Sequence, residues 1–64
     1  MVDWATRKVI MLIEDDSNLI GLLKTHLQAA NFGVMAFYSV EDALRTLRNR
    51  RPDLIILDIN MPGM

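Results

Sequence analysis

The chain contains three short apolar runs, and longer segments that mix polar and apolar residues lie between them. The runs at Val9–Ile13 and Leu54–Leu57 are apolar throughout, a pattern typical of strands that are covered on both faces. The run at 34–38 is more mixed and predicts a further strand with a less uniform environment. Both fully apolar runs lead directly into carboxylates, and two buried strands that end in this way require a common explanation.

A first helix is predicted at 17–30. Either Asp16 or Ser17 can cap its opening turn. Gly33, just beyond its end, is expected to take the positive φ that often terminates a helix. Its apolar residues recur at helical spacing and predict one packed stripe: Leu19, Leu22, Leu23, Leu27 and Ala30.

A second helix is predicted to open at Ser39, with Asp42 three positions later as an imperfect capping box. Pro52 stops it, because the residue before a proline is disfavoured in helical conformation. The arginines at 45–51 are interpreted as a solvated helix end that suits the helix dipole. Its apolar stripe follows the i, i+3, i+4, i+7 pattern: Val40, Ala43, Leu44 and Leu47.

The elements therefore alternate as strand, helix, strand, helix, strand. This order predicts an α/β fold with a parallel sheet and helices on its faces. If the third strand returns on the opposite side of the first strand from the second, the strand order is 2-1-3. The winding then reverses at the first strand, and ligands of open α/β sheets bind in the crevice at such a point.

The composition allows one small globular domain. The chain has 64 residues, of which 52% are hydrophobic and 23% charged, so a disordered chain is excluded. A formal net charge of -1 argues against direct nucleic-acid binding by this segment. No apolar run approaches the roughly 18 residues of a membrane span. The absence of cysteine is compatible with a cytoplasmic location, which we expect here.

The acids at 14–16 and Asp58 follow two parallel strands, so they are expected at the same edge of the sheet. Clustered carboxylates repel one another, and a hard divalent cation such as Mg²⁺ compensates that charge. A carboxylate can also act as a nucleophile toward phosphorus. A single aspartate after a strand is more often a turn or cap residue, and an acidic triplet is usually solvated. Only the two acidic strand ends together indicate a site.

The stretches "VIMLIEDDSNL" and "PDLIILDINMPGM" resemble the response-regulator receiver domain of two-component signalling. In that family an acidic pair ends the first strand, and a phosphorylated aspartate ends the third within D-x-x-M-P. The resemblance implies a flavodoxin-like, doubly wound parallel sheet, here truncated to β-α-β-α-β with strand order 2-1-3. It further implies a lead-in at 1–7 and the N-terminal half of a receiver domain at 8–64.

Carried over to this sequence, the resemblance implies a role for each polar residue of the motifs. Asp58 is the phosphoacceptor and a metal ligand. Glu14 and Asp15 are the acidic pair, with Asp15 favoured as the direct Mg²⁺ ligand and Glu14 acting directly or through water. Asn60 supplies a backbone carbonyl to the metal. Asp16 is interpreted as a helix cap or a solvated charge.

The family domain is about twice as long, and it carries a Ser or Thr and a Lys on later strands that contact the phosphoryl group. Neither lysine of this chain is expected to replace that Lys. Lys8 starts the first strand, roughly 17 Å from the site at about 3.3 Å per residue, and Lys24 lies in a helix. We therefore expect this chain to be an N-terminal piece of a longer protein and a poor phosphoacceptor by itself.

The leading functional hypothesis is a phosphoacceptor module that receives a phosphoryl group from a histidine kinase or phosphotransfer protein. It modifies itself and is not a turnover enzyme. One alternative is a self-associating structural piece with an inactive site. A Mg²⁺-dependent phosphohydrolase is a third, but such enzymes usually have a second Asp where this chain has Asn60.

The strand at Leu54–Leu57 is expected to lie at the sheet edge with apolar surface open beside it. Such an edge is a template for pairing with another chain. We therefore predict a homo-oligomer joined through this strand, or its cover by the remainder of a longer chain.

Overall fold

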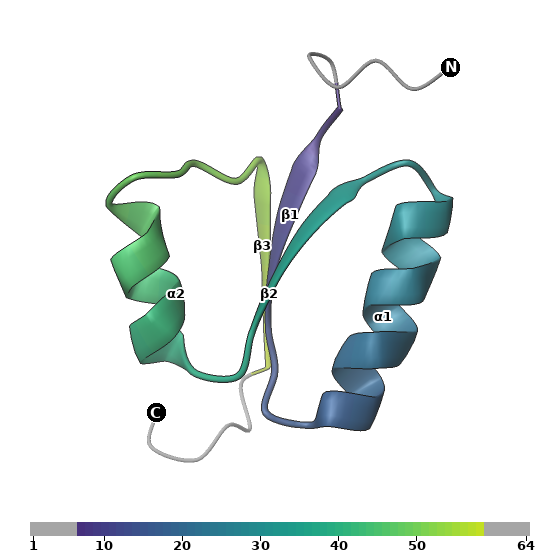
Figure 1. Cartoon of the computed structure of the whole chain (residues 1–64), viewed down its shortest axis with the longest axis horizontal. Coiled ribbons are helices and arrows are strands. Elements are labelled where there is room, and N and C mark those ends of the chain that lie inside the picture. The colour runs from purple at the N-terminus through teal and green to yellow at the C-terminus, as the bar shows by residue number, and fades with distance from the viewer. Residues whose placement is uncertain (1–6, 59–64) are drawn as a thin grey trace.

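The computed structural model describes residues 7–58, which form a three-stranded parallel sheet with one helix on each face (Figure 1). The sheet order is β2-β1-β3. The predicted α/β fold and the reversal of winding at the first strand are therefore confirmed. Neither helix in this range is long and apolar enough to cross a membrane. The elements are, in chain order, β1 (Val9–Ile13), α1 (Ser17–Ala29), β2 (Gly33–Phe37), α2 (Val40–Leu47) and β3 (Leu54–Leu57).

The core lies on the two faces of β1, the central strand. Met11 and Ile13 point to the face covered by α2, where they form a buried cluster with Ala43. Because side chains alternate along a strand, Ile10 and Leu12 point to the opposite face, which α1 covers (Figure 1). The continuous apolar pattern of β1 thus reflects cover on both faces. Partly buried residues complete the cluster under α2: Met35, Phe37, Val40 and Leu47.

Of the two predicted caps of α1, Asp16 takes the position. Its Oδ1 accepts hydrogen bonds from the backbone N–H groups of Asn18 and Leu19, at 2.9 and 3.3 Å. The helix contributes Ile20 to the core, a residue outside the predicted stripe. Leu19 and Leu22, which were predicted to pack, are exposed. The side of α1 that packs on the sheet is therefore the one that carries Ile20, and Leu19 and Leu22 lie outside it.

The turn after α1 is made by Asn31, so the expectation of a positive φ at Gly33 is wrong. Asn31 has φ 72° and donates its N–H to the carbonyl of Gln28 at 3.0 Å. Asparagine tolerates this left-handed conformation better than most residues. Gly33 opens β2 instead, where an added Cβ would lie 3.3 Å from the Cγ2 atom of Val9. β2 consequently begins and ends one residue earlier than predicted.

α2 starts as predicted, with the Oγ atom of Ser39 accepting from the backbone N–H of Asp42 at 3.3 Å. It ends at Leu47, well before Pro52, because the following residues close into a tight turn. Leu44 is exposed although its spacing predicted packing. The helix approaches the sheet through its small buried alanine, which leaves Leu44 on the flank.

β3 is an edge strand with little cover on either face, as predicted. Leu54, Ile55 and Leu57 are 55%, 45% and 40% exposed, and Ile56 is half-buried. The four residues of β1 that pair with β3 are all buried, in contrast to β3 itself. The pairs are Ile10 with Leu54, Met11 with Ile55, Leu12 with Ile56 and Ile13 with Leu57.

Asp53 ties the start of β3 to the start of β1. Its backbone N–H donates to the carbonyl of Val9 at 2.7 Å, and its Oδ2 accepts from the backbone N–H of Val9 at 2.7 Å. This two-way contact ties the residue just before β3 to the first residue of β1.

Candidate functional site

The carboxyl ends of β1 and β3 meet at one edge of the sheet because the two strands are parallel neighbours. Just beyond the strands, backbone hydrogen bonds hold both chain segments. The N–H of Glu14 donates to the carbonyl of Phe37 at 3.0 Å, and the N–H of Asp58 donates to the carbonyl of Ile13 at 3.1 Å. The predicted shared edge is therefore confirmed, at the point where the winding reverses.

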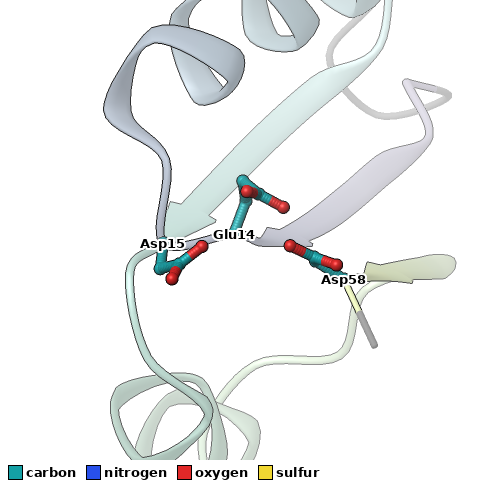
Figure 2. Close-up of side chains that lie close together, drawn as sticks. All are labelled: Glu14, Asp15 and Asp58. Atoms are coloured by element: carbon teal, nitrogen blue, oxygen red, sulfur yellow. The ribbon is translucent and has the colours of Figure 1, made fainter. Parts of the chain in front are cut away.

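Three carboxylates gather at this edge and form the acidic cluster: Glu14, Asp15 and Asp58. One oxygen from each lies within 4.8 Å of the others. The three side chains point toward one another (Figure 2). Glu14 is 5% exposed, Asp15 is exposed and Asp58 is half-buried, so the cluster has a buried floor and an open side.

Glu14 is the buried acid of the cluster, and its pKa is raised above the ordinary value. Burial is the main cause, because it disfavours the charged form, and a hydrogen bond with the side chain of Asp58 adds to it. The negative charges of Asp58 and Asp15 raise the pKa further. A backbone N–H donor opposes these effects: Asp16 donates to the Oε1 atom of Glu14 at 3.2 Å.

The consecutive acids at 14–16 have three different environments. Glu14 forms the floor of the acidic cluster, Asp15 stands at its open side, and Asp16 turns its carboxylate to cap α1. Of the two interpretations left open for Asp16, the cap is confirmed. Asn60, predicted to supply a carbonyl to the metal, lies outside the described residues.

The two lysines of the chain lie away from the acidic cluster. Lys8 precedes β1 and is at the opposite end of that strand from Glu14, as predicted. Lys24 lies within α1.

Sequence reasoning did not identify the backbone groups that place the acids. The carbonyl of Phe37 fixes Glu14 from the neighbouring strand, and the N–H of Asp16 holds its carboxylate. Every residue carries these groups, so side-chain patterns contain no signal for them.

The donor set of the acidic cluster suits a hard divalent cation. Carboxylate oxygens are the ligands that Mg²⁺ prefers, and a cation offsets the repulsion that raises the pKa of Glu14. Glu14, Asp15 and Asp58 are the described residues that would hold such an ion. The half-buried carboxylate of Asp58 also has the chemistry of an oxygen nucleophile.

Comparison with known proteins places the chain in a family. The family model of the response regulator receiver domain matches residues 10–64. Comparison with solved structures gave no significant match.

Curated relatives share the same region. Transcriptional regulatory protein AfsQ1 of Streptomyces coelicolor is 42% identical over 55 residues, which are 86% of this chain and 24% of that protein. Transcriptional regulatory protein PrrA of Mycobacterium tuberculosis is 38% identical over 53 residues, 83% of this chain and 23% of that protein. The chain thus spans about a quarter of the length of these relatives. It belongs to the response regulator receiver domain family of two-component systems.

Proposed function

We propose that Asp58 is the phosphoacceptor of a two-component receiver and that the acidic cluster binds Mg²⁺ for this reaction. One observation carries the proposal. The three acids converge within 4.8 Å at the carboxyl ends of β1 and β3, where the winding of the sheet reverses.

The reaction is a phosphoryl transfer from a phosphohistidine of a kinase or phosphotransfer protein. A carboxylate oxygen of Asp58 bonds to phosphorus, the P–N bond of the phosphohistidine breaks, and the released imidazole nitrogen takes a proton. Mg²⁺ supplies charge neutralisation for the phosphoryl oxygens. Glu14 and Asp15 hold that ion beside the acceptor. The protein modifies itself, so this is not enzymatic turnover.

The relatives named above are transcriptional regulatory proteins. We infer that the receiver serves such a regulator as its signal input. Direct contact with nucleic acid is assigned to other parts of that regulator, because this chain has a net charge of -1 and an acidic site.

Magnesium binding is the first test. Titration with Mg²⁺, followed by NMR, should shift the amide signals around Glu14, Asp15 and Asp58 in the wild-type chain. Asp58→Asn removes one ligand charge, and we expect it to weaken binding by about tenfold or more. Glu41→Gln removes an acid in the first turn of α2, outside the cluster, and should leave the titration unchanged. Equal binding by wild type and Asp58→Asn would refute the proposed site.

Phosphorylation is the second test. Intact-mass measurement after incubation with a small phosphodonor and Mg²⁺ should show a phosphoryl adduct on Asp58 that is lost in Asp58→Asn. We expect slow, substoichiometric reaction of the 64-residue chain, because its two lysines lie away from the acidic cluster. An adduct that persists in Asp58→Asn would assign the acceptor to another residue.

A further inference from the structure

Two backbone carbonyls from one pair of residues hold the acidic cluster. The carbonyl of Phe37 accepts the N–H of Glu14 at 3.0 Å. The carbonyl of Ile13 accepts the N–H of Asp58 at 3.1 Å. Ile13 and Phe37 are direct partners in the register of β1 and β2. The spacing of Glu14 and Asp58 therefore depends on how this one pair is held.

The side chains of the same pair lie in the buried cluster under α2. Ile13 packs there with Met11 and Ala43, and Phe37 packs against this cluster. Ala43 is 0% exposed, so α2 meets the sheet through a small side chain that is completely enclosed. Protein interiors are close-packed, and an added methyl group displaces its neighbours. The size of the side chain at position 43 therefore sets how closely α2 approaches the pair of Ile13 and Phe37.

The connection from β2 to α2 is short (Figure 1). Two residues separate Phe37, the end of β2, from Val40, the start of α2. The second of the two, Ser39, accepts the N–H of Ala43 with its carbonyl oxygen at 3.3 Å. A shift of α2 relative to the sheet is therefore expected to move the carbonyl of Phe37, and the acid that it holds moves with it.

Magnesium and calcium ions respond differently to such a shift. Mg²⁺ requires a near-octahedral set of ligands at about 2.0–2.1 Å, whereas Ca²⁺ accepts flexible geometry at about 2.3–2.6 Å. The three carboxylates of the acidic cluster supply the charge for either ion. Their spacing therefore decides the preference between the two ions.

We propose that Ala43 is a positioning residue for the acidic cluster. Its small side chain lets α2 lie close to the pair of Ile13 and Phe37. This packing fixes the spacing of the acids that the two carbonyls hold, and that spacing favours Mg²⁺ over Ca²⁺. The cation preference rests on the proposed function, because it requires the acidic cluster to bind an ion. The packing step rests only on contacts among the described residues.

The Mg²⁺ and Ca²⁺ dissociation constants of Ala43→Val, measured by NMR titration of the chain, test the proposal. Valine adds two methyl groups at the contact. We expect Mg²⁺ binding to weaken by about threefold to tenfold and Ca²⁺ binding by no more than about twofold. A loss of folded protein alone scales both apparent constants by the same factor and leaves their ratio unchanged. A wild-type ratio in Ala43→Val would overturn the proposal.

Two control variants separate the size of the side chain from loss of stability. Ala43→Ser adds only a hydroxyl, which can bond to the carbonyl of the residue four positions earlier, and it should keep the wild-type ratio. Ile10→Val removes one carbon from the face that α1 covers and should lower stability without changing the ratio. A ratio altered equally in Ile10→Val and Ala43→Val would exclude a specific role of α2.

Hydrogen exchange of the metal-free chain gives a readout that needs no ion. In Ala43→Val, the amides of Glu14 and Asp58 should exchange at least about threefold faster relative to amides in the middle of α1. The amides of α1 report the general loss of stability. The same acceleration in both places would contradict the positioning role.

Ile13→Val serves if Ala43→Val does not fold. It removes one carbon from the same contact, and Ile10→Val makes the identical change near the other end of β1. Ile13→Val should change the ratio of the two constants by about twofold or more, and Ile10→Val should not. Equal ratios in the two variants would reject the proposal. A wild-type chain that binds no Mg²⁺ refutes the proposed function, and hydrogen exchange then decides the positioning role.

Discussion

β1 and β3 are nearly the same in sequence character and opposite in environment. Both are uninterrupted apolar runs that end in carboxylates. β1 lies between two strands and two helices, and Leu12 at its centre is 1% exposed. β3 lies at the edge, and Leu54 is 55% exposed. An apolar run therefore indicates a strand whose side chains are suited to burial on both faces of a sheet. The position of the strand in the sheet decides whether neighbouring strands and helices bury it.

The acids that follow the two strands differ in the same way. Glu14, after β1, is buried and its pKa is raised, whereas Asp58, after β3, is half-buried. A nucleophile must be reached by its substrate, and a ligand that anchors an ion is best held still. Under the proposed function, the buried Glu14 would anchor the ion and the more accessible Asp58 would react.

The largest test of the comparison is a matched pair of leucine truncations. Leu12→Ala should lower the free energy of unfolding by about 2–5 kcal/mol, because it removes a fully buried side chain. Leu54→Ala should cost less than about 1 kcal/mol. Urea unfolding in dilute solution, where chains do not associate, measures both. Equal losses would show that β1 and β3 are equally buried in solution.

A smaller effect is expected where β3 is tied to β1. Asp53→Ala removes the acceptor for the N–H of Val9 and should cost about 1–2 kcal/mol. Hydrogen exchange should quicken in β3 more than at Ile10 and Leu12 in β1, whose N–H groups lie on the β2 side of the strand, as that of Glu14 does. Asp53→Asn keeps an acceptor oxygen and should lose only part of the stability that Asp53→Ala loses. Uniform acceleration across the sheet would mean that Asp53 does not act on β3 specifically.

Exposed leucines on the helices should show a still smaller effect. Leu44→Gln and Leu22→Gln change side chains that stand outside the core, so each should shift the free energy of unfolding by no more than about 0.5 kcal/mol. Ala43→Gln, at a fully buried neighbour, supplies the contrast because it overpacks the contact between α2 and β1. A large loss in the free energy of unfolding for Leu44→Gln would show that Leu44 packs in the core.

The last and smallest expected effect is a change in folding stability with pH. The raised pKa of Glu14 means that the folded state keeps this proton to higher pH than the unfolded chain does. Its contribution to stability is therefore fully present below the ordinary pKa of 4.5 and is lost as pH rises through the raised value. Glu14→Gln should gain stability relative to wild type across that window, measured by thermal unfolding with chelator present. Exposed Glu41→Gln is the control, and curves for Glu14→Gln parallel to wild type would contradict the prediction.

Sequence patterns predicted the elements and the shared acidic edge because each depends on local spacing and on strand direction. The facing of individual leucines was not predictable in the same way. Leu22 and Leu44 fit the apolar stripes of their helices, yet both are exposed. The buried residues are Ile20 in α1 and Ala43 in α2. Asn31 was missed because a glycine stood two residues away as the stronger turn signal. The backbone donors and acceptors that place Glu14 have no residue-specific pattern at all.

The hydrogen bonds from Glu14 to Phe37 and from Asp58 to Ile13 have a consequence for the order in which the molecule forms. Each joins segments far apart in the chain, so both long loops must close before the three carboxylates can meet. The ends of a small sheet open most often, and the acidic cluster is built on such an end. An ion bound there would favour the closed state by mass action. The affinity for a cation at this edge therefore reports the fraction of molecules in which the backbone hydrogen bonds at this end of the sheet are formed.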